Sequence, residues 1–206
     1  MFDKENTDIV VVASHRKKAL VLEYLKDVPH KVNYTPDYPL SEDFEPEIPG
    51  FVQPCHQHHV NTYRCFRGHQ DAVKLCDKEN VLIFEDDAVP NVGDWLGIVA
   101  ESTPLLNTFE MVSFHGRNYD RALYENHSEI RPGNNFMCIP AVKKQETTFV
   151  CGALAYLLNR RVFERVLSYR YNGIPIDILL YSTLSFCLLE KSPFNHDRSE
   201  GSLIDV

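Results

Sequence analysis

The feature that most restricts the fold of this chain is an apolar run that ends in three consecutive carboxylates. Residues 81–84 read Val-Leu-Ile-Phe, and Glu85, Asp86 and Asp87 follow directly. Such a run, rich in β-branched and aromatic residues, is typical of a strand buried on both faces, as in a parallel sheet covered by helices. Because adjacent strand residues point to opposite faces, Glu85 and Asp87 share one side and Asp86 points away.

Acidic side chains at the end of a buried strand predict a bound cation. Ligands of open α/β sheets bind at the carboxyl ends of the strands. Two like charges on one side repel each other unless a cation neutralises them or sugar hydroxyls donate hydrogen bonds to them. Carboxylate oxygens favour Mg²⁺ or Mn²⁺, usually shared with substrate phosphates, which indicates a nucleoside diphosphate substrate. On this segment alone, a solvated turn after a core strand is an equally good interpretation.

Strand and helix patterns alternate along the chain. The region 35–54, rich in proline and acidic residues, is expected to be irregular and could form a flap. Helical spacing occurs at 16–25, 58–78, 93–106, 160–169 and 175–189, and strand patterns occur at 8–14, 30–34, 80–84, 109–114 and 147–158, with a polar extended end at 192–206. This alternation predicts one α/β domain over residues 1–206, with a mixed, mostly parallel central sheet flanked by helices.

Composition narrows the class of protein. A chain of 206 residues with 44% hydrophobic and 24% charged residues is an ordinary globular domain. Its net charge of -8 argues against nucleic acid as a partner. The sequence contains no apolar run of membrane-spanning length and begins with a charged segment, so we expect a cytoplasmic protein, or one of the host cytoplasm if it is viral. The cysteines are expected to be reduced.

Two further groups of residues are candidates for substrate contacts. Ser14, His15 and Arg16 follow the first predicted strand and would lie at the same sheet edge as the carboxylates, where they could meet a nucleotide. The alternative is a helix N-cap with a solvated basic turn. Arg67 or His69 could face a donor phosphate or sugar, because the intervening Gly68 is unfavourable in a helix unless something approaches closely; a simple packing glycine is the alternative.

Cysteine and histidine residues between positions 55 and 69 form a weak zinc pattern. Structural zinc sites usually combine paired ligands from two separate segments, and no matching Cys/His pair occurs elsewhere in the sequence. We therefore do not expect a zinc site built from these residues.

Two late residues complete the candidate set. Asp177 stands near the start of an otherwise apolar helix, where desolvation would raise its pKa and suit a general base, or where it would simply complement the helix dipole. His196 could be a third metal ligand, and neutral imidazole suits Mn²⁺ better than Mg²⁺. A surface tail is the alternative for this region.

The order of these motifs resembles glycosyltransferase family 25, which includes lipopolysaccharide and collagen galactosyltransferases and is similar to virus-encoded capsid glycosyltransferases. The matching segments are 67–69, 85–89, 152–157, 175–177 and 202–204. The resemblance implies a GT-A (Rossmann-like) fold, with Asp87 and His196 as metal ligands, Glu85 or Asp86 on the ribose or donor sugar, and Asp177 on the acceptor side. The chain departs from the family after the first strand, where Ala13-Ser14-His15-Arg16 replaces the usual Asn-Leu-Asp.

These observations predict a metal-dependent hexosyltransferase. It would use Mn²⁺ or Mg²⁺, take a nucleotide sugar, with a UDP-sugar favoured, and transfer the sugar to a hydroxyl of a glycan or glycoprotein acceptor with inversion. Two alternatives use the same acidic cluster: a metal-dependent nucleotidyltransferase or phosphohydrolase, and a non-catalytic nucleotide-sugar-binding domain. The sequence does not determine the oligomeric state.

Overall fold

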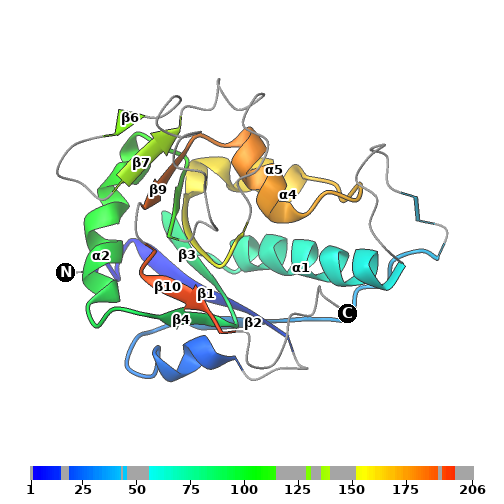
Figure 1. Ribbon diagram of the computed structural model, residues 1–206, viewed down its shortest axis with the longest axis horizontal. Coiled ribbons are helices and arrows are strands. Elements are labelled where there is room, and N and C mark those ends of the chain that lie inside the picture. Colours follow the sequence, from blue (N-terminus) through cyan, green and yellow to red (C-terminus); the bar gives the residue numbers. More distant parts are fainter. Residues whose placement is uncertain are drawn as a thin grey trace.

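A mixed sheet lies at the centre of the protein (Figure 1). The structure is a computed structural model and describes residues 2–14, 19–42, 44–45, 56–114, 129–130, 136–139, 152–189 and 192–197. The eight strands of this sheet are, in spatial order, β2 (Lys31–Thr35), β1 (Thr7–Ser14), β3 (Asn80–Glu85), β8 (Ala155–Asn159), β5 (Met111–Ser113), β9 (Phe186–Leu189), β7 (Phe136–Ile139) and β6 (Glu129–Ile130). The pairings make β8 and β7 antiparallel to the other six strands, so the predicted mixed, mostly parallel sheet is confirmed.

Helices cover both faces of the sheet. One face carries α1 (His56–Lys74), α4 (Phe163–Ser168) with its preceding turn η4 (Arg160–Val162), and α5 (Ile176–Thr183). The other carries α2 (Trp95–Ser102) and the 3₁₀ turns η1 (Leu20–Glu23) and η2 (Thr103–Asn107), so α1 and α2 lie on opposite sides in Figure 1. None of the described helices is both long and apolar enough to cross a bilayer.

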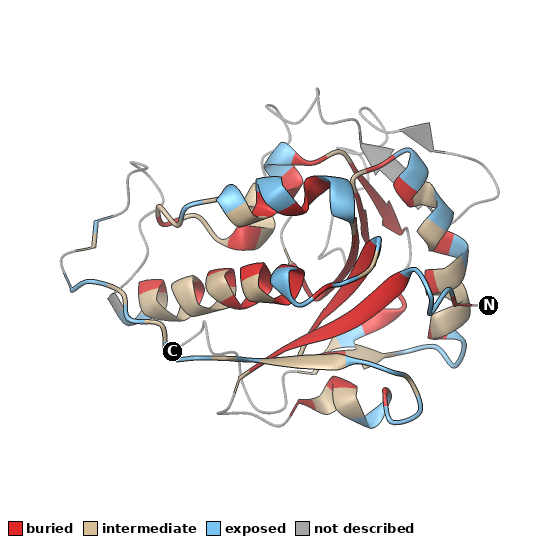
Figure 2. Ribbon diagram, turned by 180° about the vertical axis from the view of Figure 1, so that it is seen from behind, coloured by how far each residue is buried: buried red, intermediate tan, exposed pale blue. Residues whose placement is uncertain are grey.

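The central strands are buried on both faces, as their apolar runs predict. In β1, Val10 and Val12 contribute to the core beneath α1, whereas Ile9 and Val11 contribute to the core beneath α2. Figure 2 shows these strands as buried, with the exposed residues on the outer faces of the helices. Each residue step along the strand therefore alternates between two separate apolar layers, which fixes the register of the sheet.

Two predicted helices differ from the structure. Within 16–25, the described residues form only the short 3₁₀ turn η1. The range 175–189 divides into α5 and β9, because the backbone is extended at Leu184 and β9 then pairs in parallel with β5. All four residues of β9 are buried. A short apolar run of this kind satisfies a buried helix and a buried strand equally well, and only its pairing with β5 decides between them.

A small second sheet brings the late part of the chain back to the end of β3. Strand β10 (Phe194–His196) pairs antiparallel with β4 (Ala88–Pro90), with His196 opposite Ala88. Phe194 is fully buried, with its ring centroid 5.1 Å from that of Phe84 and 5.7 Å from that of Trp95. This aromatic anchor docks the extended segment, and His196, two residues further on, shares the inward side.

Gly68 is explained by close packing. A Cβ atom at this position would lie 2.5 Å from Thr35 Oγ1 and 3.0 Å from Val12 Cγ1. The Gly68 carbonyl also accepts a hydrogen bond of 2.8 Å from the Asn33 side chain. The glycine therefore lets α1 lie directly against β1 and β2, and the packing interpretation of Gly68 accounts for it.

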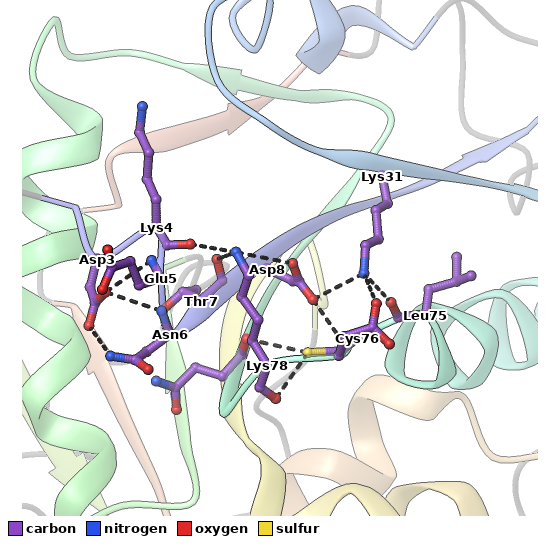
Figure 3. A network of polar contacts seen from close by, with 12 residues as sticks. Asp3, Lys4, Glu5, Asn6, Thr7, Asp8, Lys31, Leu75, Cys76 and Lys78 are labelled. Carbon is purple, nitrogen blue, oxygen red and sulfur yellow. Dashed lines mark hydrogen bonds and ion pairs between the residues drawn. The ribbon is translucent and has the colours of Figure 1, made fainter.

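The amino-terminal end of β1, at the opposite end of the strand from the carboxylates, is held by a network of charges (Figure 3). Asp8 is buried and accepts hydrogen bonds from Lys31 Nζ (3.1 Å) and the Asp77 backbone N–H (2.8 Å), with Lys78 Nζ 3.5 Å away. Burial opposes ionisation of Asp8, but these hydrogen bonds and charges outweigh it and lower the pKa of Asp8 below 3.8. The ionised carboxylate therefore stabilises the folded state.

We expect Asp8→Asn to lower the free energy of unfolding at pH 7 by about 1–2 kcal/mol, because a charged hydrogen-bond acceptor is lost beneath partly exposed lysines. Since the pKa of Asp8 is lowered on folding, its contribution is present above the unfolded value and disappears as the pH falls through the folded value. Urea unfolding at pH 7 and pH 3 measures this. Asp77→Asn, which removes a largely exposed partner of Lys31, is the control. An equal loss at both pH values would contradict the argument.

Candidate active site

Three residues from two distant parts of the sequence meet at the carboxyl end of β3. Glu85 ends β3, Asp87 lies in the turn before β4, and His196 ends β10. His196 Nδ1 lies 3.2 Å from Asp87 Oδ2, and the three side chains offer ligand atoms within 4.8 Å of one another. The Asp87 carbonyl accepts a hydrogen bond of 3.0 Å from the Asp197 N–H, which fastens the two segments together.

The donor set suits a hard or borderline divalent cation. Asp87 Oδ1 is buried and accepts no hydrogen bond from the part of the chain that the structure describes. A buried carboxylate oxygen without a partner is rare in folded proteins, and a bound ion or an ordered water molecule would satisfy it. Two carboxylates and one imidazole fit Mn²⁺ well and Mg²⁺ less well, because Mg²⁺ prefers oxygen ligands alone.

Asp86 points to the other side of the strand end. Its Oδ2 accepts a hydrogen bond of 2.8 Å from the Ser14 N–H, and its carbonyl accepts one of 3.3 Å from the Val21 N–H. Asp86 therefore holds the end of β1 against the end of β3 and places Ser14 at the shared edge. The other two residues predicted to contact a nucleotide, His15 and Arg16, lie outside the described residues.

A buried polar chain supports Glu85 from behind. His69 is fully buried on α1, with Nε2 3.3 Å from Glu85 Oε1 and Nδ1 2.7 Å from the Tyr156 hydroxyl of β8. The Cys65 thiol, one turn earlier on α1, lies 4.0 Å from the same Glu85 oxygen. The sequence predicts His69 as a contact to a donor phosphate or sugar and includes Cys65 only in the weak zinc pattern, and nothing in it indicates Tyr156. The spacing of Cys65 and His69, four residues apart in a predicted helix, indicates that the two side chains lie on the same face of that helix.

Arg67 lies on a different face of α1 from His69. Two residues apart on a helix point about 200° apart, so both side chains cannot face Glu85. The Arg67 guanidinium stacks over the Tyr38 ring at 5.3 Å, beside Asp71. This places Arg67 next to the described part of the 35–54 segment, and its contact with a substrate stays a prediction.

Asp177 connects two segments of the fold and also has a raised pKa. Its carboxylate accepts a hydrogen bond of 2.7 Å from the Gly152 N–H, which ties the segment before β8 to α5, and one of 2.9 Å from the Ile178 N–H within α5 itself. Gly152 has φ 106°, a conformation that favours glycine. Burial raises the pKa of Asp177 above 3.8, and the charge of Glu85 adds to this, although the two hydrogen bonds oppose it. A carboxylate with a raised pKa is suited to accept a proton.

The four acidic side chains act on a common point. Burial raises the pKa of the Cys65 thiol well above 9.0, and the charges of Glu85, Asp177, Asp86 and Asp87 raise it further. All four carboxylates are therefore close enough to influence the one thiol of Cys65, which is partly buried. So much negative charge in a partly desolvated region strongly favours a cation.

The protein has distant likenesses to known proteins. No known family profile matches the sequence, and no curated protein matches it. Among solved structures, A197 from STIV is 13% identical, with a TM-score of 0.46, over 93% of this chain and 85% of that protein. A glycosyltransferase involved in the glycosylation of the major capsid of PBCV-1 is 13% identical, with a TM-score of 0.34, over 77% and 63%. HddC from Yersinia pseudotuberculosis is 11% identical, with a TM-score of 0.38, over 88% and 69%. The identities and TM-scores of these three structures are low.

Proposed function

We propose that the protein is a metal-dependent glycosyltransferase that uses a nucleoside diphosphate sugar. The observation that carries this proposal is the convergence of Glu85, Asp87 and His196 at the carboxyl end of the parallel strands β1 and β3. Within it, a buried oxygen of Asp87 has no hydrogen-bond donor among the residues that the structure describes. Nucleotide ligands of α/β sheets bind at this edge. A site that joins a cation to a diphosphate and has a carboxylate of raised pKa nearby supports sugar transfer.

Glu85, Asp87 and His196 would hold the cation, with Mn²⁺ preferred over Mg²⁺. When bound, the cation supplies Lewis-acid neutralisation of the charge that develops on the departing diphosphate. Asp86 and the backbone at Ser14 keep the ends of β3 and β1 together, and so fix the edge on which the nucleotide would lie. A UDP-sugar is the favoured donor.

Asp177 would act on the acceptor. Its carboxylate is held in place by two backbone N–H groups, yet each oxygen keeps a second lone pair for a hydroxyl proton. As the acceptor oxygen of a glycan or glycoprotein attacks the anomeric carbon from the face opposite the diphosphate, Asp177 would accept its proton, and the product would have inverted configuration. His69, which contacts the Tyr156 hydroxyl, lies against the Glu85 carboxylate and keeps it oriented for its role as a metal ligand.

A ligand screen tests this proposal. UDP-, GDP- and CMP-sugars are each added with and without Mn²⁺, and we expect a UDP-sugar to stabilise the protein against thermal unfolding only when Mn²⁺ is present. At a ligand concentration 100-fold above Kd, the expected gain in the free energy of unfolding is about 2.7 kcal/mol. Release of UDP in the presence of glycan acceptors then measures turnover. No stabilisation by any nucleotide sugar would contradict the proposal. Mn²⁺-dependent binding without turnover would favour a binding domain, and diphosphate release from a nucleotide without sugar transfer would favour a nucleotidyltransferase.

A further inference from the structure

We propose that Cys65, His69 and Glu85 form a second metal site, of the kind that binds Zn²⁺, next to the Glu85–Asp87–His196 site. The three residues offer a sulfur, a nitrogen and an oxygen ligand within 4.8 Å of one another. Cys65 and His69 occupy successive turns of α1, and Glu85 faces them from the end of β3. The two donor sets share Glu85, but they differ in ligand chemistry and in the elements that supply them.

Two of the three distances between the ligand atoms are close to those of a tetrahedral site, and the third, between Cys65 and His69, is no longer than 4.8 Å. With metal–ligand bonds of about 2.0–2.3 Å, the edges of a zinc tetrahedron are about 3.3–3.6 Å long. The observed separation between His69 Nε2 and Glu85 Oε1 is 3.3 Å, and that between Cys65 Sγ and Glu85 Oε1 is 4.0 Å. A movement of a few tenths of an ångström by the Cys65 side chain would close the second edge.

The environment of His69 is that of a metal ligand. Histidines that bind metals usually engage their other ring nitrogen in a hydrogen bond, which fixes the ring orientation and the tautomer. His69 is fully buried, and its Nδ1 lies 2.7 Å from the Tyr156 hydroxyl, so that Nε2 is directed at Glu85. Tyr156 itself is almost completely buried on β8, and this arrangement therefore has little freedom to change.

The ligand types select the metal. An imidazole and a thiolate, which the Cys65 thiol becomes when a metal ion displaces its proton, favour Zn²⁺ over Mg²⁺ and Mn²⁺, which prefer oxygen ligands. Three protein ligands leave a fourth position open, as in zinc sites that bind a water molecule or a substrate. Because two dications that share Glu85 repel each other, occupancy of this site would weaken Mn²⁺ binding at Asp87 and His196. This last consequence rests on the proposed function, whereas the zinc site itself does not.

Titration of the reduced full-length protein with Co²⁺, a spectroscopic substitute for Zn²⁺, tests the site. We expect a thiolate-to-cobalt charge-transfer absorption that saturates near one equivalent and is displaced by Zn²⁺. Cys65→Ala should abolish this absorption, and the matched variant Cys187→Ala, in the buried strand β9, should retain it. Asp87→Ala should also retain it, because that variant removes only the proposed Mn²⁺ site; the two proposals can therefore fail independently.

A second variant guards against a folding defect in Cys65→Ala. His69→Gln keeps the thiol and should weaken Co²⁺ binding by about tenfold or more, while metal-free thermal unfolding shows whether each variant is folded. Absence of a thiolate band in the wild-type protein would overturn the proposal. So would a band that persists unchanged in Cys65→Ala.

Discussion

Asp87→Ala is expected to abolish Mn²⁺-dependent binding of the nucleotide sugar and to lower kcat/KM for transfer by about 10³-fold or more. Metal-assisted neutralisation of a leaving diphosphate supplies several kcal/mol, and about 4 kcal/mol corresponds to a factor of 10³ in rate. Asp87 is the residue whose buried Oδ1 has no hydrogen-bond donor among the described residues, so its removal deletes the ligand that most needs the cation. Calorimetric titration with Mn²⁺, with and without a UDP-sugar, measures the effect.

The matched control for this variant is Asp77→Ala, which removes a largely exposed carboxylate in the turn after α1 and should leave the Mn²⁺ affinity unchanged. Folding is checked by thermal unfolding without metal. Because Asp87 stands among like charges, its loss should not lower the stability of the metal-free protein by more than about 1 kcal/mol. If Asp87→Ala binds Mn²⁺ and nucleotide sugar as tightly as the wild-type protein, the proposed metal site is wrong.

The local part of this site is readable from sequence because strand geometry is local. The apolar run before Glu85 predicts a buried strand, and the alternation of side chains separates Glu85 and Asp87 from Asp86. In the structure, the Asp86 carboxylate accepts a hydrogen bond from the Ser14 N–H, and the carboxylates of Glu85 and Asp87 lie together with His196. The sheet order follows from the same runs only in part, since short apolar segments such as β9 take their identity from their partners.

The non-local part of the site depends on packing that no short segment encodes. His196 could be proposed from its chemistry, but its position beside Asp87 depends on Phe194, whose ring enters an aromatic cluster contributed by β3 and α2. In the weak zinc pattern of residues 55–69, Cys65 lacks a second Cys/His pair to complete a site. The residue that completes its set is Glu85, which the fold of α1 against β3 brings to it.

Asp177→Asn is expected to lower kcat by about 10²–10⁴-fold, the usual contribution of a general base, with little change in donor binding. Burial raises the pKa of Asp177, so in the wild-type protein kcat should rise with pH as this carboxyl loses its proton, at a pH above 3.8. The variant should lack this rise of kcat with pH, the acidic limb of the pH profile.

The effect of the Asp177 pKa on stability has the opposite sign. A pKa that is raised in the folded state favours folding at low pH, and this advantage is lost as the pH rises through the folded-state pKa. The amide avoids that charge but loses one of the two N–H bonds, so we expect a stability change within about 1 kcal/mol.

Gly152→Ala separates catalysis from structure at this position. It strains the backbone at a φ of 106° and disturbs the clamp on Asp177, but it keeps the carboxylate. We expect Gly152→Ala to lose about 1–3 kcal/mol of stability and to retain the acidic limb of the pH profile. If Asp177 only ties β8 to α5, the two variants should lose stability and activity in parallel, and Asp177→Asn should keep the wild-type pH profile. If Asp177 is the base that takes the acceptor proton, the opposite result is expected. The Asp177→Asn enzyme should be stable but its kcat should not rise with pH in the acidic range, whereas the Gly152→Ala enzyme should be less stable but keep the wild-type pH dependence of kcat.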